Sequence, residues 1–118
     1  MAISNIQDIT NDFNNNSGVW VLDVDSWDYV VVQLVSPSGT VTFKTTNDSG
    51  DIQGSGDGNQ YSATNFINVQ GTDLASGSGV TSLAATGLVK FSGIGKYLQL
   101  TSSSATVTKA IVRLYKIF

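Results

Sequence analysis

Two groups of side chains in this sequence could carry chemistry, and the first is a set of carboxylates beside two indole rings. Asp23, Asp25 and Asp28 lie close together, with Trp20 and Trp27 among them. Paired carboxylates can hydrolyse a glycosidic bond, but the acid must be buried in a cleft that raises its pKa. A turn between short strands offers little cleft, so we expect solvated turn carboxylates. Because flat rings stack on sugars, a carbohydrate-binding module stays an alternative, although tryptophans more often pack in cores.

The second group lies in a long polar insert at residues 47–65. It contains Asp48, Asp51 and Asp57 among glycines and serines, a composition that could supply oxygen ligands to calcium. The spacing does not match the EF-hand pattern, and the chain has no glutamate to end such a loop. Asp and Gly also form tight turns without an ion, so we expect turns, no metal site and no cofactor. The glycine-rich run at 54–58 lacks the Gly-Lys-Ser/Thr of a phosphate-binding loop.

Composition narrows the function classes further. The chain of 118 residues has no His and no Cys, which removes imidazole catalysis, thiol nucleophiles and disulfides. We therefore expect no enzyme. The net charge is −3, and the six basic residues form no stripe, so we expect neither nucleic acid nor a membrane surface as a partner. The N-terminal residues lack the positive and apolar regions of a signal peptide.

The elements that must position these residues are predicted to be strands. Ser, Thr, Asn and Gly make up 48 of the 118 residues, and these types favour strands and turns over helices. We expect an all-β fold, a single antiparallel β-sandwich or jelly roll of seven or eight strands. The segment 29–35 should be covered on both faces or central to a sheet, and 110–115 should run through the middle of one. The predicted strands cover residues 19–23, 28–35, 40–46, 66–69, 87–92, 97–101 and 106–117, with an eighth around 80–84.

Side chains in the predicted strands divide into inward and outward sets. Residues 40–46 alternate strictly, which puts Val41, Phe43 and Thr45 on one buried face. The predicted inward side chains of the later strands are Phe66, Leu88, Phe91, Leu98, Leu100, Val107, Ile111, Val112, Leu114 and Ile117.

The N-terminal residues 1–18 have a different texture from the predicted sandwich domain at 19–118. Ile3, Ile6, Ile9 and Phe13 recur at helical spacing, which predicts a short helix or turn. Such a segment could cover the open end of the core, or it could be an arm that docks on a neighbouring subunit.

Four stretches of the chain resemble a known family. Residues 29–34 (YVVVQL) and 39–50 (GTVTFKTTNDSG) are similar to the strand and Asn-Asp-Gly corner of small β-sandwich proteins from tailed bacteriophage virions. Residues 95–100 (GKYLQL) and 110–115 (AIVRLY) resemble later strands of that family. Gln99 stands where the family usually has a basic residue, and Ser49 interrupts the corner.

The resemblance implies a virion structural protein, made in the host cytoplasm, that decorates or cements the capsid shell. A tail or neck structural or receptor-binding protein and a carbohydrate-binding module are the alternatives. The implied partners are the major capsid protein and a second or third copy of the chain, with carbohydrate as a further ligand to consider. We expect the partner contacts in the N-terminal segment and the polar insert, at Ile3, Ile6, Ile9, Phe13, Asp51, Asp57, Tyr61 and Phe66.

Overall fold

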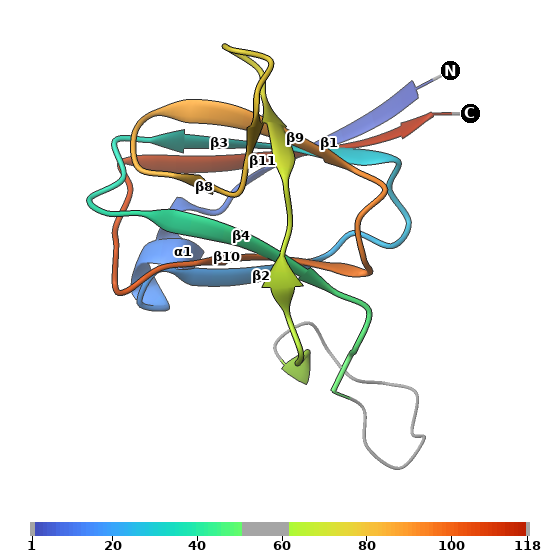
Figure 1. Cartoon of the computed structure of the whole chain (residues 1–118), viewed down its shortest axis with the longest axis horizontal. Coiled ribbons are helices and arrows are strands. Elements are labelled where there is room, and N and C mark those ends of the chain that lie inside the picture. The colour runs from blue at the N-terminus through green and yellow to red at the C-terminus, as the bar shows by residue number, and fades with distance from the viewer. Residues whose placement is uncertain (1, 51–61, 118) are drawn as a thin grey trace.

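The described part of the chain is a sandwich of two antiparallel sheets with one short helix, which confirms the predicted all-β class (Figure 1). A computed structural model describes residues 2–50 and 62–117. The first sheet has six strands in the order β1-β11-β3-β9-β6-β7, and the second has the order β2-β10-β4-β5 with β8 also paired to β4.

The described residues form eleven strands, so the sandwich is more finely divided than predicted. The six-stranded sheet contains β1 (Ala2–Asp8), β3 (Tyr29–Val35), β6 (Gly71–Asp73), β7 (Gly79–Val80), β9 (Gly87–Ser92) and β11 (Lys109–Ile117). The five-stranded sheet contains β2 (Val19–Asp23), β4 (Val41–Thr46), β5 (Ile67–Asn68), β8 (Ser82–Leu83) and β10 (Tyr97–Thr101). The predicted strands at 19–23, 87–92 and 97–101 coincide with β2, β9 and β10, whereas β1 and β6 were not predicted.

The core lies between the two sheets and follows the two-residue period of a strand. In β3 the side chains of Val30, Val32 and Leu34 are buried, because alternate residues point to the same face. Across the core, the rings of Phe43 and Phe91 meet edge to face with centroids 5.0 Å apart. Burying each such side chain stabilises the fold by about 1.5–3 kcal/mol.

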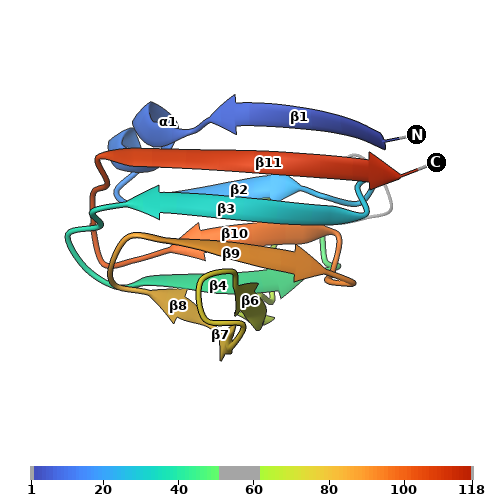
Figure 2. The same cartoon turned by 90° about the horizontal axis from the view of Figure 1, so that it is seen from above.

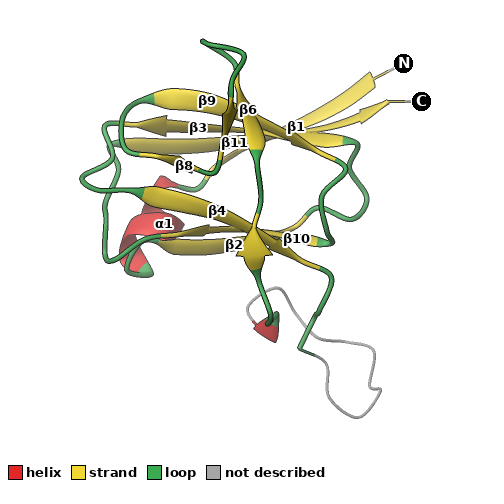
Figure 3. Cartoon of the chain, in the orientation of Figure 1, coloured by secondary structure: helices red, strands yellow, loops and turns green. Residues whose placement is uncertain are grey.

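The N-terminal segment differs from the predicted helix. Residues 2–8 form the strand β1, which pairs in continuous register with β11 from Ala2↔Ile117 to Asp8↔Ile111. A helix at residues 2–8 would have few apolar contacts and an unfavourable nucleation free energy. As a strand, the same residues form backbone hydrogen bonds with β11. A helix does follow, α1 (Thr10–Asn15), and it packs against β2 and β11 (Figure 3).

The predicted inward side chains are confirmed where they follow the alternation of their strand. Phe91, Leu98, Leu100, Val107, Val112 and Leu114 are buried, and so are Val41, Phe43 and Thr45. Leu88, Ile111 and Ile117 were wrongly placed inside. Successive side chains of a strand point to opposite faces of the sheet, and these three residues occupy the positions that alternate with the buried ones. Their side chains therefore lie on the face of the six-stranded sheet that is turned away from the core.

Candidate interaction surface

The outer face of the six-stranded sheet, turned away from the core, is the most distinctive surface of the described residues. Its centre is formed by β3 and β11, where the register sets Tyr29 beside Tyr115, Val31 beside Arg113 and Gln33 beside Ile111. We call this surface the outer face. It is defined by Ile6 of β1, Tyr29, Val31 and Gln33 of β3, Leu88 and Lys90 of β9, Ile111, Arg113 and Tyr115 of β11, and Leu74.

A stacked pair of tyrosines occupies one end of the outer face. The rings of Tyr29 and Tyr115 lie 4.4 Å apart between centroids, with 25° between their planes. Lys90 Nζ lies 4.3 Å from the centroid of Tyr29, and the guanidinium carbon of Arg113 lies 4.2 Å from the centroid of Tyr115. One face of each ring is therefore covered by the other tyrosine and the second face by a cation. Each cation–π contact at an exposed site is worth about 0.5–1 kcal/mol.

This arrangement places one cation against each ring of the pair. A sugar that stacks on either ring would have to compete with the other tyrosine or with that cation. Trp20, named in the sequence as a possible sugar platform, is only 4% exposed and belongs to the core. Trp27 is half-buried and packs against the same core.

Beside the tyrosine pair lies an apolar groove of about 350 Å³. Its lining consists of Ile6, Val31, Gln33, Leu74, Leu88, Ile111, Arg113 and Tyr115. Ile6 is 66% exposed and Leu74 48% exposed, although both are large aliphatic side chains. A second hollow of about 260 Å³ shares Gln33, Leu74 and Leu88 with the groove, so the apolar surface continues toward Thr86.

The rim of the groove is held by backbone hydrogen bonds. Leu74 follows β6, and its N–H donates to the carbonyl of Leu88 at 2.9 Å. The hairpin between β6 and β7 closes with Gly77 N–H to the Asp73 carbonyl at 2.7 Å and Asp73 N–H to the Ser78 carbonyl at 2.8 Å. The exposed leucines are thus presented by ordered backbone, as a pre-organised binding surface requires.

A charged cluster marks the end of β1 next to the outer face. Asp8 accepts hydrogen bonds from the Thr10 hydroxyl at 2.6 Å and the Thr10 N–H at 3.0 Å, and its other oxygen meets Lys109 Nζ at 3.2 Å. These donors favour the charged carboxylate and lower the pKa of Asp8 to about 2, with Thr10 as the larger cause and Lys109 the smaller. Asp8 thus binds the N–H of Thr10, the first residue of α1, from the position before the N-cap residue Ile9.

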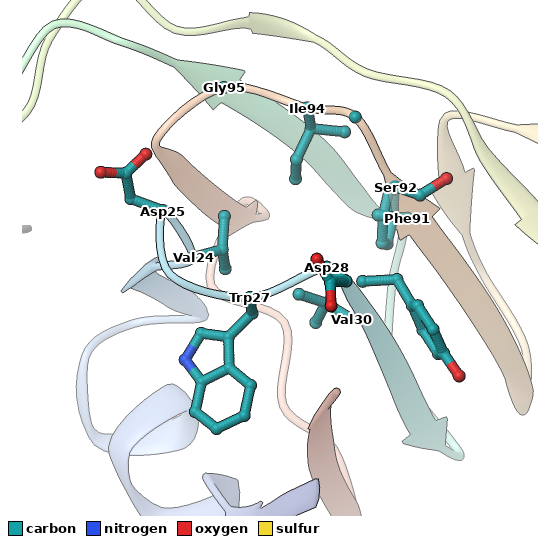
Figure 4. Close-up of a pocket in the computed structure, with 11 residues that line it drawn as sticks. Val24, Asp25, Trp27, Asp28, Val30, Phe91, Ser92, Ile94 and Gly95 are labelled. Carbon is teal, nitrogen blue, oxygen red and sulfur yellow. The ribbon is translucent and has the colours of Figure 1, made fainter. Parts of the chain in front are cut away.

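The acidic cluster of the sequence lies at a different place, around a pocket of about 200 Å³ (Figure 4). Asp25 and Asp28 line it with Trp27, but the Asp25 carboxylate points away from Asp28. Asp23 accepts a hydrogen bond from the Asp25 N–H at 3.0 Å, and Asp28 accepts one from the Ile117 N–H. Two of the three carboxylates therefore hold backbone, Asp28 fastening the end of β11 to the start of β3.

Asp48 of the polar insert, which was weighed as a possible calcium ligand, also binds protein donors. Its Oδ1 accepts the Gly50 N–H at 2.9 Å, and its Oδ2 accepts the Asn65 amide at 2.7 Å and the Thr64 hydroxyl at 3.1 Å. These bonds lower the pKa of Asp48, the Gly50 bond most. They tie the two ends of the polar insert together. Among residues 2–50 and 62–117 there is no group of three acidic side chains that could hold a metal ion.

The predicted partner-contact residues are dispersed. Ile3 and Ile6 are exposed on β1, and Phe66 is half-buried. Ile9, just before α1, and Phe13, on α1, are both buried in the core, so neither side chain lies on the surface of the described structure. Asp51, Asp57 and Tyr61 lie outside the described residues.

The outer face itself was missed, yet the sequence held a signal for it. Residues 29–35 are apolar or aromatic at nearly every position, which predicted a strand that is covered on both faces or central to a sheet. The strand is central to its sheet, because β3 lies between β11 and β9. In a sandwich of two layers each strand has only one core face. The second apolar face of such a strand must then be solvent-exposed or covered by something other than the core.

Comparison with known proteins identifies the fold class. No protein-family model matches the chain, and no curated protein matches it in sequence. Among solved structures, it is similar to the SPBc2 prophage-derived protein YomS, with a TM-score of 0.66. That match covers 98% of this chain and 96% of YomS, at 10% sequence identity. The two proteins therefore share a fold over nearly their whole length.

In the described part of the chain, no helix is long and apolar enough to cross a membrane.

Proposed function

We propose that this chain is a non-catalytic structural protein of a bacteriophage virion, and that it decorates the capsid shell by binding the major capsid protein through the outer face. The observation that carries the proposal is a pre-organised apolar groove with Lys90 and Arg113 held near it against the tyrosine rings, on a sheet whose opposite side supplies the core. Contiguous exposed apolar surface of this kind marks an interaction site.

Two further observations support a virion component. The protein whose fold this chain shares, YomS, is described as prophage-derived, and the strand and turn sequences resemble those of phage β-sandwich proteins. The described carboxylates of the two acidic clusters are largely engaged in holding turns and strand ends, as expected of a scaffold that does no chemistry.

The chemistry of the outer face specifies what it would bind. Apolar side chains of the partner would enter the groove between Ile6 and Leu88, and acidic groups of the partner would face Lys90 and Arg113. On a capsid lattice the same contact repeats many times, so a modest affinity for each subunit suffices for stable decoration of the shell.

The experiment is to purify particles of the phage or induced prophage that encodes the chain, separate heads from tails, and measure binding of the purified protein by co-sedimentation. We expect the wild type to sediment with heads. Leu88→Lys should bind at least about tenfold more weakly, because a charge would enter the apolar groove. Asn68→Lys is the matched control, since Asn68 is exposed on β5 of the other sheet.

Equal binding by the two variants would exclude the outer face as the docking surface. If the protein sedimented with tails alone, the result would exclude capsid decoration and support a role in the tail. Absence of the chain from purified particles would overturn the proposal of a virion protein.

A further inference from the structure

Strand β1 is an edge of the six-stranded sheet with one side of its backbone unpaired in the described structure. Figure 2 shows β1 as the outermost strand of its sheet, next to β11. The bond from Ile9 N–H to the Ala110 carbonyl, 2.8 Å, sets the phase of the ladder. Along an antiparallel strand, the backbone N–H and C=O groups of successive residues point alternately to the two sides. The backbone groups of Asn5 and Gln7 therefore point toward β11, as those of Ile9 do. The N–H and C=O groups of Ser4 and Ile6 point to the free edge.

This edge lacks the features that usually prevent one strand from pairing with another. The sequence of β1, AISNIQD, has no Pro and no Lys, and its register with β11 is continuous over seven residues without a bulge. The opposite edge of the same sheet, β7, is only two residues long, as is the edge strand β5 of the other sheet. Ile6 adds a 66% exposed aliphatic side chain at the middle of β1.

We propose that β1 pairs antiparallel with β1 of a second copy of this chain, about a two-fold axis at Ile6, so that two six-stranded sheets join into one. Identical strands meet isologously about such an axis, and closed two-fold dimers are the commonest oligomers. In this register Ile6 lies beside Ile6 of the second copy on the outer face. Ser4 lies opposite Asp8, and on the other side of the sheet Asn5 lies opposite Gln7, where two amides can exchange hydrogen bonds.

The charges on β1 favour a second copy as the occupant. Asp8 is the single charged side chain of the strand, and its own Lys109 compensates it at 3.2 Å. The two-fold register sets each Asp8 against a serine, so no like charges meet across the new ladder. An unrelated strand would have to match the short polar pattern of β1 by chance, whereas the pattern of β1 matches itself.

The pairing also continues the outer face. Because the axis is perpendicular to the joined sheet, both outer faces lie on the same side, with the Ile6 end of each groove at the junction. A dimer would therefore present two grooves side by side. The inference does not rest on the proposed function, since it needs only the free edge of β1.

Sedimentation velocity and light scattering over a range of concentrations test the pairing in the full chain. We expect a concentration-dependent dimer. Ser4→Pro removes an N–H that points to the free edge and spares the bonds to β11, so it should weaken dimerisation by about tenfold or more, because two intermolecular hydrogen bonds are lost per dimer. Ser4→Thr keeps the N–H and should dimerise like the wild type. A wild type that stays monomeric, or a folded Ser4→Pro variant that dimerises normally, would overturn the proposal.

Single-cysteine variants give a second measurement that does not depend on how Ser4→Pro folds. The chain has no cysteine of its own. In the proposed register the two Ile6 Cα atoms would lie about 5.5 Å apart, within the range of a disulfide. Ile6→Cys should form a covalent dimer on mild oxidation, and Ser92→Cys, exposed on β9 away from the edge, should not. Equal cross-linking of both variants, or none at position 6, would contradict the pairing at Ile6.

Discussion

Both faces of the six-stranded sheet carry large apolar side chains, yet the two faces have opposite roles. On β3, Val30, Val32 and Leu34 point into the core, whereas Tyr29 and Val31 point to the outer face. The core face gains its free energy when the chain folds, because the second sheet covers it. The outer face keeps its apolar surface available after folding. The contrast shows that hydrophobicity marks a residue for burial without saying whether its own chain or another molecule covers it.

The largest expected difference between the faces comes from truncating one side chain on each. Phe91→Ala should lower the free energy of unfolding by about 3–5 kcal/mol, because it leaves a cavity beside Phe43. Leu88→Ala, on the outer face of the same strand, should cost less than about 1 kcal/mol. Urea denaturation of both variants at one protein concentration makes the comparison. Similar losses for the two would show that the outer face is covered in the free protein.

A smaller effect is expected from one substitution on each face of β6, a methyl added at Gly71 and a hydroxyl replaced by a methyl at Thr72. A Cβ at Gly71 would meet a ring carbon of Phe91 at 2.6 Å and the Lys90 carbonyl at 2.9 Å. Gly71→Ala should therefore destabilise the fold by about 1–3 kcal/mol through overpacking. Its neighbour Thr72 is exposed, and Thr72→Val adds no such clash and should stay within about 0.5 kcal/mol of the wild type. Thermal unfolding measures both, and an unchanged melting temperature for Gly71→Ala would mean that β6 lies farther from the core.

Next in size is the coupling between the two tyrosines of the outer face. A double-mutant cycle with Tyr29→Ala and Tyr115→Ala should give an interaction free energy of about 0.5–1.5 kcal/mol, because the rings stack directly. The same cycle with Tyr29→Ala and Leu74→Ala is the control. Additive losses for the two tyrosines would mean that the stack contributes nothing and that the outer face is less ordered than its geometry indicates.

The smallest effect is electrostatic and concerns the charged end of β1. The pKa of Asp8 is about 2 in the folded protein and 3.8 in its ordinary state. Because the pKa of Asp8 is lower in the folded than in the unfolded protein, its carboxylate stabilises the fold at pH values above 3.8. This contribution is lost as the pH falls from 3.8 toward 2. The stability gap between wild type and Asp8→Asn should therefore narrow across that range. Urea denaturation at a series of pH values measures it, and a gap that stays constant would show that the Thr10 and Lys109 contacts are not maintained.

The predicted parts of the fold are those that depend on local pattern. Strict alternation at 40–46 identified the buried Val41 and Phe43, and a run of β-branched and aromatic residues located β3. Leu88 was misplaced because it stands in an apolar run, where the pattern does not show which of two neighbouring side chains points toward the core.

Residue types and their spacing determined that this chain forms strands, that it lacks imidazole and thiol chemistry, and that one strand is apolar on both faces. Only the tertiary structure decided that Ile6 is exposed while Ile9, three residues later, lies in the core. That outcome depends on the pairing of β1 with β11, about a hundred residues away, as the contact of Asp8 with Lys109 illustrates. Local periodicity carries no information about such a distant partner, because the free energy that selects strand over helix there comes from the ladder itself.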